Sequence, residues 1–369
     1  MSVKRHQLHA KRGQAQASEG PRSDSLKTLE AEYASRPSGE QSDEHSSRLL
    51  VLVVATALRS LNECLYLVRE LPQDQPAVLV LIHEQKVSPL MREMQRLLGL
   101  WRLLHPVLPQ ATYRASNRRL KALLALLSNA SLALCLERFA GHVRPDTRKN
   151  RRAIEDVVKL TTKFAARMAS RSPVTQPGLN PALSVAELTV FLEQESSVWR
   201  GVPTTDLAQG LVLDRGFLRT YRRGQRGLRR LIRNRPRAAH DRMAELARWQ
   251  SWVWAFAAQL SLFARGRDDV RQRDYWYVQH LAESLEEAVA LLQLQCDPQF
   301  ARLSRKYLAR NTQRRAQAVM QARLERLRDR QRLLGRKVYD RTAPEFGYDM
   351  ACAVEALESQ SALNMLLLA

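Results

Sequence analysis

The chain has 369 residues, of which 59 are Lys or Arg and 37 are Asp or Glu, so its net charge is +22. Ten of the basic residues are lysines and 49 are arginines. Hydrophobic residues make up 45%, which is enough to build a core, while Gly and Pro are scarce at 14 and 15. This composition excludes a chain that is disordered throughout and a collagen-like or low-complexity protein, and it disfavours a turn-rich β-sandwich.

The cysteines are far apart, and none has a histidine at metal-ligand spacing; they are Cys64, Cys135, Cys296 and Cys352. This pattern is typical of free thiols in a reducing compartment. No signal peptide is evident, and the apolar run at 49–58 is shorter than the ~20 residues that a membrane span needs. We therefore expect a cytoplasmic protein with no membrane partner.

Residues 1–47 are rich in Ser, Glu and Arg and predict a disordered lead. From Leu49 onward apolar residues recur at helical spacing, so we expect an all-α fold. A run at 77–82 resembles a strand but is too short to count as one. Helices are expected at about 49–71, 89–104, 113–139, 151–170, from 185, and at 217–233, 238–265, 274–296 and 298–339.

Residues 172–184 contain three prolines and a glycine and predict a linker between two helical halves. Ser184 and Glu187 have the spacing of a capping box, which predicts the start of the next helix. The expected organisation is a first half at about 48–171, the linker at about 172–184, a second half at about 185–346 and a C-terminal extension at 347–369.

The positive charge is concentrated in two short segments. Residues 215–242 have a net charge of +10 and residues 302–337 a net charge of +11. Solubility does not require such concentration, whereas a partner with dense negative charge would explain it.

The first basic segment forms an amphipathic helix on a helical wheel. Seven arginines fall on a stripe about 120° wide: Arg219, Arg222, Arg223, Arg226, Arg229, Arg230 and Arg233. Guanidinium groups match phosphate bidentately, so the stripe predicts a phosphate-rich ligand; the alternative is a solvated helix face. Gly224 and Gly227 weaken the helix and therefore indicate close approach to a neighbouring helix.

The second basic segment is less focused. Arg302, Arg305 and Lys306 share one face of their helix, which permits a binding role. From Arg323 to Lys337 the basic residues spread around all sides, which is typical of a solvated helix.

The stretch from Phe217 to His240, FLRTYRRGQRGLRRL…H, resembles the CHAD domain, the conserved-histidine α-helical domain. That family carries a helix of the form LRxxYRRGRRAL, followed by a helix that opens with His. The first element is matched by Leu218, Arg219, Tyr221, Arg222, Arg223, Gly224 and Arg226, and His240 opens the second. The stretch Ser88–Pro109 is similar to the helix of the family's first repeat.

The resemblance covers about residues 49–346 and implies two repeated antiparallel helical bundles around a basic central cavity. It also implies non-enzymatic binding of inorganic polyphosphate or another phosphate-rich polyanion, without cofactor or metal, and association with polyphosphate granules and their proteins. Combined with the basic helices, it predicts these binding residues: Arg219, Arg222, Arg223, Arg226, Arg229, Arg230, His240, Arg92, Arg96, Arg102, Arg305 and Lys306.

Part of the family pattern is missing here. Ser88 occupies the first-repeat histidine position, and Met91, Met243 and Ala244 stand where basic residues are expected. Two alternatives therefore stay open: a helical scaffold that keeps the fold and has lost the ligand, and nonspecific nucleic-acid binding through the same arginines.

Two other groups of residues have simpler interpretations. Trp249, Trp252 and Phe256 lie three and four residues apart, which predicts core packing more than a base-stacking platform. The carboxylates at 283, 286 and 287 predict a helix face or partners for arginines rather than a metal site. His83, His105 and His280 are expected to be packing or surface residues.

Overall fold

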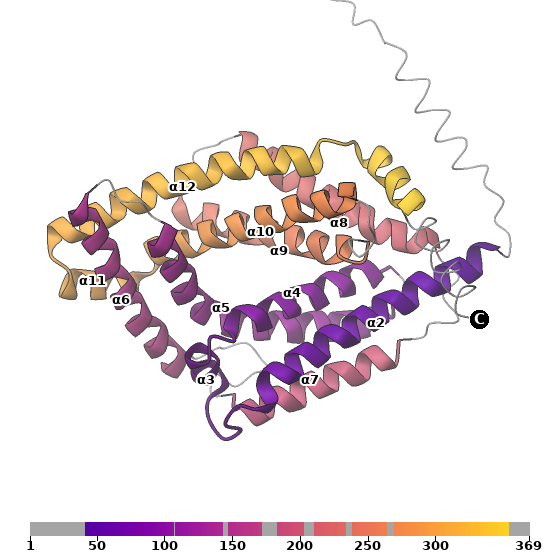
Figure 1. Ribbon diagram of the computed structural model, residues 1–369, viewed down its shortest axis with the longest axis horizontal. Helices are drawn as coiled ribbons and strands as arrows, with labels where there is room; N and C mark the ends of the chain where they lie inside the picture. The colour runs from indigo at the N-terminus through magenta and orange to yellow at the C-terminus, as the bar shows by residue number, and fades with distance from the viewer. Residues whose placement is uncertain are drawn as a thin grey trace, which may run out of the picture. The chain divides into compact units, whose positions relative to one another are not determined.

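The computed structural model describes residues 41–106, 108–142, 147–171, 183–202, 210–233, 238–263 and 269–353. Apart from their connections these residues are helical (Figure 1), which confirms the all-α prediction for this part of the chain. The helices are α2 Gln41–Arg69, α3 Ala77–His83, α4 Val87–Leu104, α5 Gln110–His142, α6 Arg148–Arg171, α7 Val185–Arg200, α8 Gly210–Arg233, α9 Ala239–Leu260, α10 Asp269–Cys296, α11 Pro298–Tyr307 and α12 Arg310–Tyr339.

Residues 77–82, whose strand-like run is too short to count as a strand, belong to helix α3. The backbone N–H of Ala77 donates to the carbonyl of Leu183 at 2.8 Å, so a distant part of the chain satisfies the start of this short helix. Burial of Val78 and Leu81 on its inner side then outweighs the β-branched composition. The chain leaves the helix through Gln85, whose φ of 55° is left-handed, as is common after a helix end.

The expected helix at 298–339 is two helices. Leu308 is extended, with φ −112° and ψ 136°, and separates α11 from α12. The side-chain amide of Gln313 donates to the carbonyls of Ser304 (3.0 Å) and Leu308 (2.8 Å), which satisfies backbone acceptors that the break would otherwise leave open. No Gly or Pro marks this break, so composition could not predict it.

The helical domain expected at about 48–346 begins earlier and ends later in the structure. Helix α2 begins at Gln41, inside the segment 1–47 expected to be disordered. At the other end the helix 343–353 buries Phe346, Met350 and Ala353, so the start of the expected extension belongs to the core. The linker at 172–182 lies outside the described residues.

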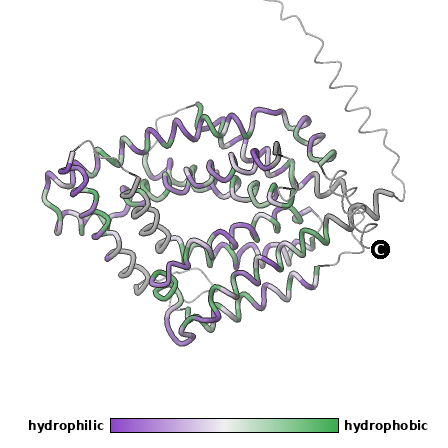
Figure 2. The backbone as a smooth tube through the Cα atoms, viewed as in Figure 1, coloured by the Kyte–Doolittle hydropathy of each residue, from purple (hydrophilic) through white to green (hydrophobic). Residues whose placement is uncertain are grey.

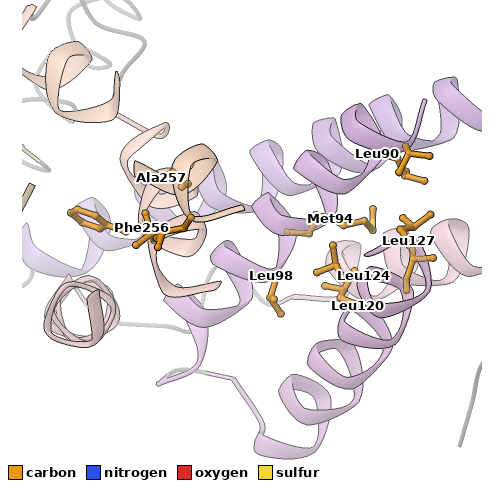
Figure 3. Close-up of a cluster of buried hydrophobic side chains, with 14 of the residues drawn as sticks. Leu90, Met94, Leu98, Leu120, Leu124, Leu127, Phe256 and Ala257 are labelled. Carbon is orange, nitrogen blue, oxygen red and sulfur yellow. The ribbon is translucent and has the colours of Figure 1, made fainter. Parts of the chain in front are cut away.

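Helix α4 packs against α5, α8 and α9 and so joins the first helices of the chain to the later ones. Figure 3 shows Leu90, Met94 and Leu98 of α4 directed toward the leucines of α5, with α9 on the other side. Gly99 lies against α9, where an added Cβ would come within 2.7 Å of the Ala258 Cβ. The small residue therefore lets the two helix backbones approach closely.

The start of α7 is joined to the connection between α2 and α3. Ser184 forms the predicted capping box with Glu187, as each side chain bonds the backbone of the other. The backbone N–H of Val185 donates to Gln75, and an isolated antiparallel bridge pairs Pro76 with Ser184. These contacts place α7 beside α4 and α5, where Trp101 and Trp199 pack with ring centroids 4.1 Å apart.

The 20-residue segment Leu50–Arg69 of α2 is long and apolar enough, with a mean hydropathy of 1.5 over an 18-residue window, to cross a membrane by length and composition. It is longer than the run at 49–58 considered from the sequence. Half of it is buried within the structure, including Val53, Ala57 and Leu61, as in the core helix of a folded domain. Along α12, in contrast, hydrophilic and hydrophobic residues alternate (Figure 2).

Candidate functional site

Helix α8 has one buried face and one cationic face. Phe217, Tyr221 and Leu228 are buried, whereas all seven arginines of the predicted stripe are exposed. We call these seven residues, Arg219, Arg222, Arg223, Arg226, Arg229, Arg230 and Arg233, the arginine stripe. The structure thus confirms the amphipathic helix that the spacing predicts.

Two glycines fix the rotation of α8. Gly224 lies directly against the Tyr339 side chain of α12, and Gly227 against the indole ring of Trp249 of α9. A Cβ at either position would overlap these rings. The predicted close approach is therefore confirmed, and it keeps the opposite, cationic face of α8 outward.

Tyr221, which the family resemblance includes in its motif, is a core residue. Its ring stacks on Phe346 at 4.1 Å, and its hydroxyl donates to the carbonyl of Arg341 at 2.7 Å. Burial raises the pKa of this hydroxyl. The Arg341 side chain donates to Asp274 and Asp349, which anchors the segment after α12.

One end of the stripe meets cationic side chains from α4 and α5. Arg102 of α4 is only 6% exposed, and its guanidinium donates to the backbone carbonyl and to the hydroxyl of Ser251 on α9. Its Cζ lies 4.4 Å from the centroid of the Trp252 ring, and Arg223 of the stripe lies 5.7 Å from the same centroid. Arg102 and Arg223 therefore share one aromatic ring.

His105 connects the end of α4 to the stripe. Its Nδ1 lies 2.6 Å from Nη1 of Arg219, and its ring packs edge-on against Tyr113 of α5 at 4.3 Å. Burial, and then the charges of Arg219 and Arg114, lower the pKa of His105 below its usual range. We call this group, made of Arg102, His105, Arg114, Lys121, Arg219 and Arg223, the basic corner.

The basic corner carries uncompensated positive charge. Burial lowers the pKa of Arg102 to about 10, a shift that Tyr113 opposes and Arg219 increases. Burial and then the charge of Arg102 lower the pKa of Lys121. Among the described residues no carboxylate forms an ion pair with any member of the corner. Such an arrangement stabilises a bound anion, because each cation lies near others of the same sign.

Farther along the stripe the arginines have weak or no partners within the described part of the chain. Arg229 donates to Gln225 at 3.3 Å, and Arg230 lies 4.0 Å from Glu245, at the limit of an ion pair. Arg222 and Arg226 form no ion pair with a described carboxylate. The stripe is thus free to bind a ligand along most of its length.

The other predicted binding residues, Arg92, Arg96, His240, Arg305 and Lys306, form no hydrogen bond or ion pair with a described member of the basic corner. Arg96 pairs with Glu93 of its own helix at 2.8 Å and lies near Cys64 of α2. Arg92 is exposed on the same helix, and His240 is exposed in the first turn of α9. Arg305 and Lys306 belong to α11, which packs against α6, α10 and α12.

Sequence reasoning missed four residues of the site or misjudged them. The sequence carries no signal for Arg114 and Lys121, and it predicts a packing or surface role for His105 and a core position for Trp252. Trp249 and Phe256 are indeed buried, but Trp252 is partly exposed beneath two guanidinium groups. The sequence signal for this difference is weak: Trp252 alone of the three lies four residues, about one helical turn, from an arginine, Arg248.

Three cavities lie apart from the stripe, and none of their lining residues belongs to α8. The first, about 520 Å³, is lined by α6 and the junction of α11 with α12; the second, about 420 Å³, includes Arg305; the third, about 320 Å³, lies beside Phe346. No member of the basic corner lines any of these three cavities.

The described residues hold no group of three His, Cys, Asp or Glu side chains that could bind a metal ion. Glu287 instead accepts two hydrogen bonds from Arg323, at 2.7 and 2.8 Å, in the ion-pair role expected for that acidic run. Cys64, Cys296 and Cys352 are free thiols. Comparison with protein-family models, curated proteins and solved structures found no match.

Proposed function

We propose that this protein binds polyanions, inorganic polyphosphate in the first place, along the arginine stripe and the basic corner, without a catalytic step. The observation that supports this function is the cationic group at the end of the stripe. Arg102 and Arg223 share the Trp252 ring, Arg219 contacts His105, and no described carboxylate forms an ion pair with any of the four. With the proposal goes the architecture implied by the CHAD resemblance, two repeated bundles around a basic cavity, and association with polyphosphate granules in the cytoplasm.

The charge arrangement favours a chain of phosphates over a single small anion. Arginines at successive turns of α8 present donors along one line, and guanidinium groups bind phosphate oxygens bidentately. Like charges spaced three and four residues apart repel in the free helix, and a bound polyanion relieves that repulsion. The affinity of a longer ligand should therefore increase with each helical turn of the arginine stripe that the ligand covers.

The aromatic residue at the site favours phosphate over nucleic-acid bases. Single-stranded nucleic acids gain affinity when their bases stack on exposed aromatic rings. At the basic corner the Trp252 ring is already in contact with the Arg102 guanidinium at 4.4 Å. Binding of DNA or RNA here would use the phosphates alone, so we expect it to be nonspecific and weaker than binding of polyphosphate.

The direct test compares long-chain polyphosphate binding to the wild type and to the Arg222→Ala/Arg223→Ala/Arg226→Ala variant. Losing three charge-assisted contacts worth about 1 kcal/mol each predicts roughly 100-fold weaker binding. The matched control removes three exposed arginines of α12, in Arg314→Ala/Arg326→Ala/Arg330→Ala, and should bind within about threefold of wild type.

Salt dependence and competition complete the test. If about four phosphates are neutralised, the logarithm of affinity should fall with the logarithm of salt concentration with a slope of about −3. Duplex DNA should compete poorly at fixed salt. Equal affinity of the wild type and the α8 variant would overturn the site, and no binding at low salt, together with a defined protein partner, would support the scaffold alternative.

A further inference from the structure

His105 is placed so that anion binding can be coupled to uptake of a proton. A guanidinium group only donates hydrogen bonds, so the 2.6 Å contact between Arg219 Nη1 and His105 Nδ1 requires a lone pair on Nδ1. In this state His105 is the neutral tautomer with its proton on Nε2. A proton on Nδ1 would face the N–H groups of Arg219, so the contact and the charged imidazole exclude each other.

The charges around His105 keep it neutral while no ligand is bound. Arg219 faces it from α8, Arg114 and Tyr113 face it from α5, and the buried Arg102 lies on its own helix near Arg219. These groups include three cations and no carboxylate. A phosphate bound among them would neutralise the field that opposes protonation of the imidazole.

Resting on the proposed polyanion function, we propose that His105 is a proton-coupled phosphate ligand at the end of the arginine stripe. A phosphoryl group takes the N–H donors of Arg219, which frees Nδ1 of His105. Nδ1 then takes one proton from solvent, and the imidazolium donates a hydrogen bond to a phosphate oxygen. The balance is one proton taken up for each occupied corner, with no covalent bond made or broken.

Calorimetry with long-chain polyphosphate measures this coupling. Titrations at about pH 7 in buffers with different ionisation enthalpies give the number of protons exchanged, and the wild type should take up a substantial fraction of one proton per site. Inner phosphates of a long chain are already fully ionised, so the chain itself contributes few protons. Affinity should rise up to about tenfold per unit as pH falls from about 8 to about 6.

The variant His105→Asn separates protonation from hydrogen bonding, because its Oδ1 can still accept from Arg219 but cannot be protonated. We expect this variant to bind polyphosphate with the same salt slope but with no proton uptake and with an affinity that varies little with pH. The matched control is His83→Asn, at an exposed histidine beside Glu84, which should keep the wild-type uptake.

Three outcomes would overturn the inference. Salt-dependent binding by the wild type without proton uptake would do so while leaving the polyanion function intact. Loss of uptake in His240→Asn but not in His105→Asn would assign the proton to the start of α9. No binding by the wild type at low salt would remove the polyanion function and this inference with it.

Discussion

Trp101 and Arg102 are neighbours in the chain, yet they face different helices and different electrostatic surroundings. The Trp101 indole N–H donates at 2.8 Å to Glu195 of α7, a fully buried carboxylate that also accepts from Arg119 at 2.8 Å. Arg102 on the adjacent side is buried against α9 with the neutral oxygens of Ser251 as acceptors. Toward α7, α4 meets a buried carboxylate that is paired with the partly exposed Arg119. Toward α9, it buries a charge that forms no ion pair with a described carboxylate.

The presence or absence of a counter-charge distinguishes arginines with a structural role from arginines that could bind an anionic ligand. A buried charge with a buried counter-charge holds two helices together, and removing either partner is costly. A buried charge without one destabilises the protein, unless a ligand offsets it. Arg119 therefore links α5 to α7 through Glu195, and we assign Arg102 to the proposed polyanion-binding site.

The largest effect on stability is expected from removing the Glu195 carboxylate. Glu195→Ala leaves the Trp101 N–H and Arg119 without their acceptor and should lower the free energy of unfolding by about 3 kcal/mol; this is the lower end of the range for buried pairs, since Arg119 is a third exposed. Urea denaturation followed by circular dichroism measures it. Glu193→Ala, at an exposed position of the same helix, should cost less than about 0.5 kcal/mol.

The next largest effect is expected at the contact between α8 and α9, the helix against which Arg102 is buried. Gly227→Ala gains about 1 kcal/mol of helix propensity but forces a methyl group into the Trp249 ring, so we expect a net loss of about 1–3 kcal/mol. Thermal unfolding would show it as a lower Tm. Gly201→Ala, where an added Cβ meets the carbonyl oxygens of Val198 at 3.5 Å and Ser197 at 3.7 Å, should leave the Tm nearly unchanged. A similar Tm for both variants would contradict this packing.

A smaller effect on stability is expected from Arg102→Met, with a clear effect on binding. The apolar side chain fills a similar volume and removes an uncompensated charge, so the free energy of unfolding should stay within about 1 kcal/mol of wild type. Polyphosphate affinity should fall about tenfold, because one cation of the basic corner is lost. A loss as large as that of Glu195→Ala would mean that both sides of α4 are structural.

The smallest effect is the pH dependence of stability at His105. Its pKa is lowered in the folded protein, so the unfolded chain binds more protons as pH falls through the ordinary histidine pKa. Stability contributed at neutral pH is therefore lost toward about pH 5. Chemical denaturation at about pH 7 and about pH 5 should show a slightly smaller loss of unfolding free energy in His105→Asn than in wild type. An equal or larger loss in the variant would contradict the neutral state of His105.

Much of the helical framework follows from local patterns. The recurrence of apolar residues located the long helices, the Ser184–Glu187 spacing located the start of α7, and Gly224 and Gly227 indicated close contacts that the structure contains. The break at Leu308 and the helix at 77–83 escaped prediction for a shared reason. Both depend on individual hydrogen bonds that apolar spacing does not signal: one from the Gln313 side chain, five residues after Leu308, and one from Ala77 to the distant Leu183 carbonyl.

The candidate site was only partly predictable, because spacing identifies a cationic face but not its counter-charges. Arg96 and Arg102 lie on the same helix and are equally basic, but Arg96 meets Glu93 while Arg102 meets Ser251 and Trp252. His105 owes its importance to Arg219, which lies 114 residues away in the chain. Such pairs follow from packing between helices and not from any single segment.

The hydrogen bond between Trp101 of α4 and Glu195 of α7 also bears on how the chain folds. Trp101 and Glu195 are 94 residues apart in the chain, so the ribosome makes α4 long before it makes the carboxylate that accepts from Trp101. During synthesis the indole N–H and Arg119 must stay solvated until α7 emerges, and closing so long a loop carries a large entropic cost. We therefore expect the first helices to remain loosely packed until about residue 200 has left the ribosome, at which point the late carboxylate closes the core.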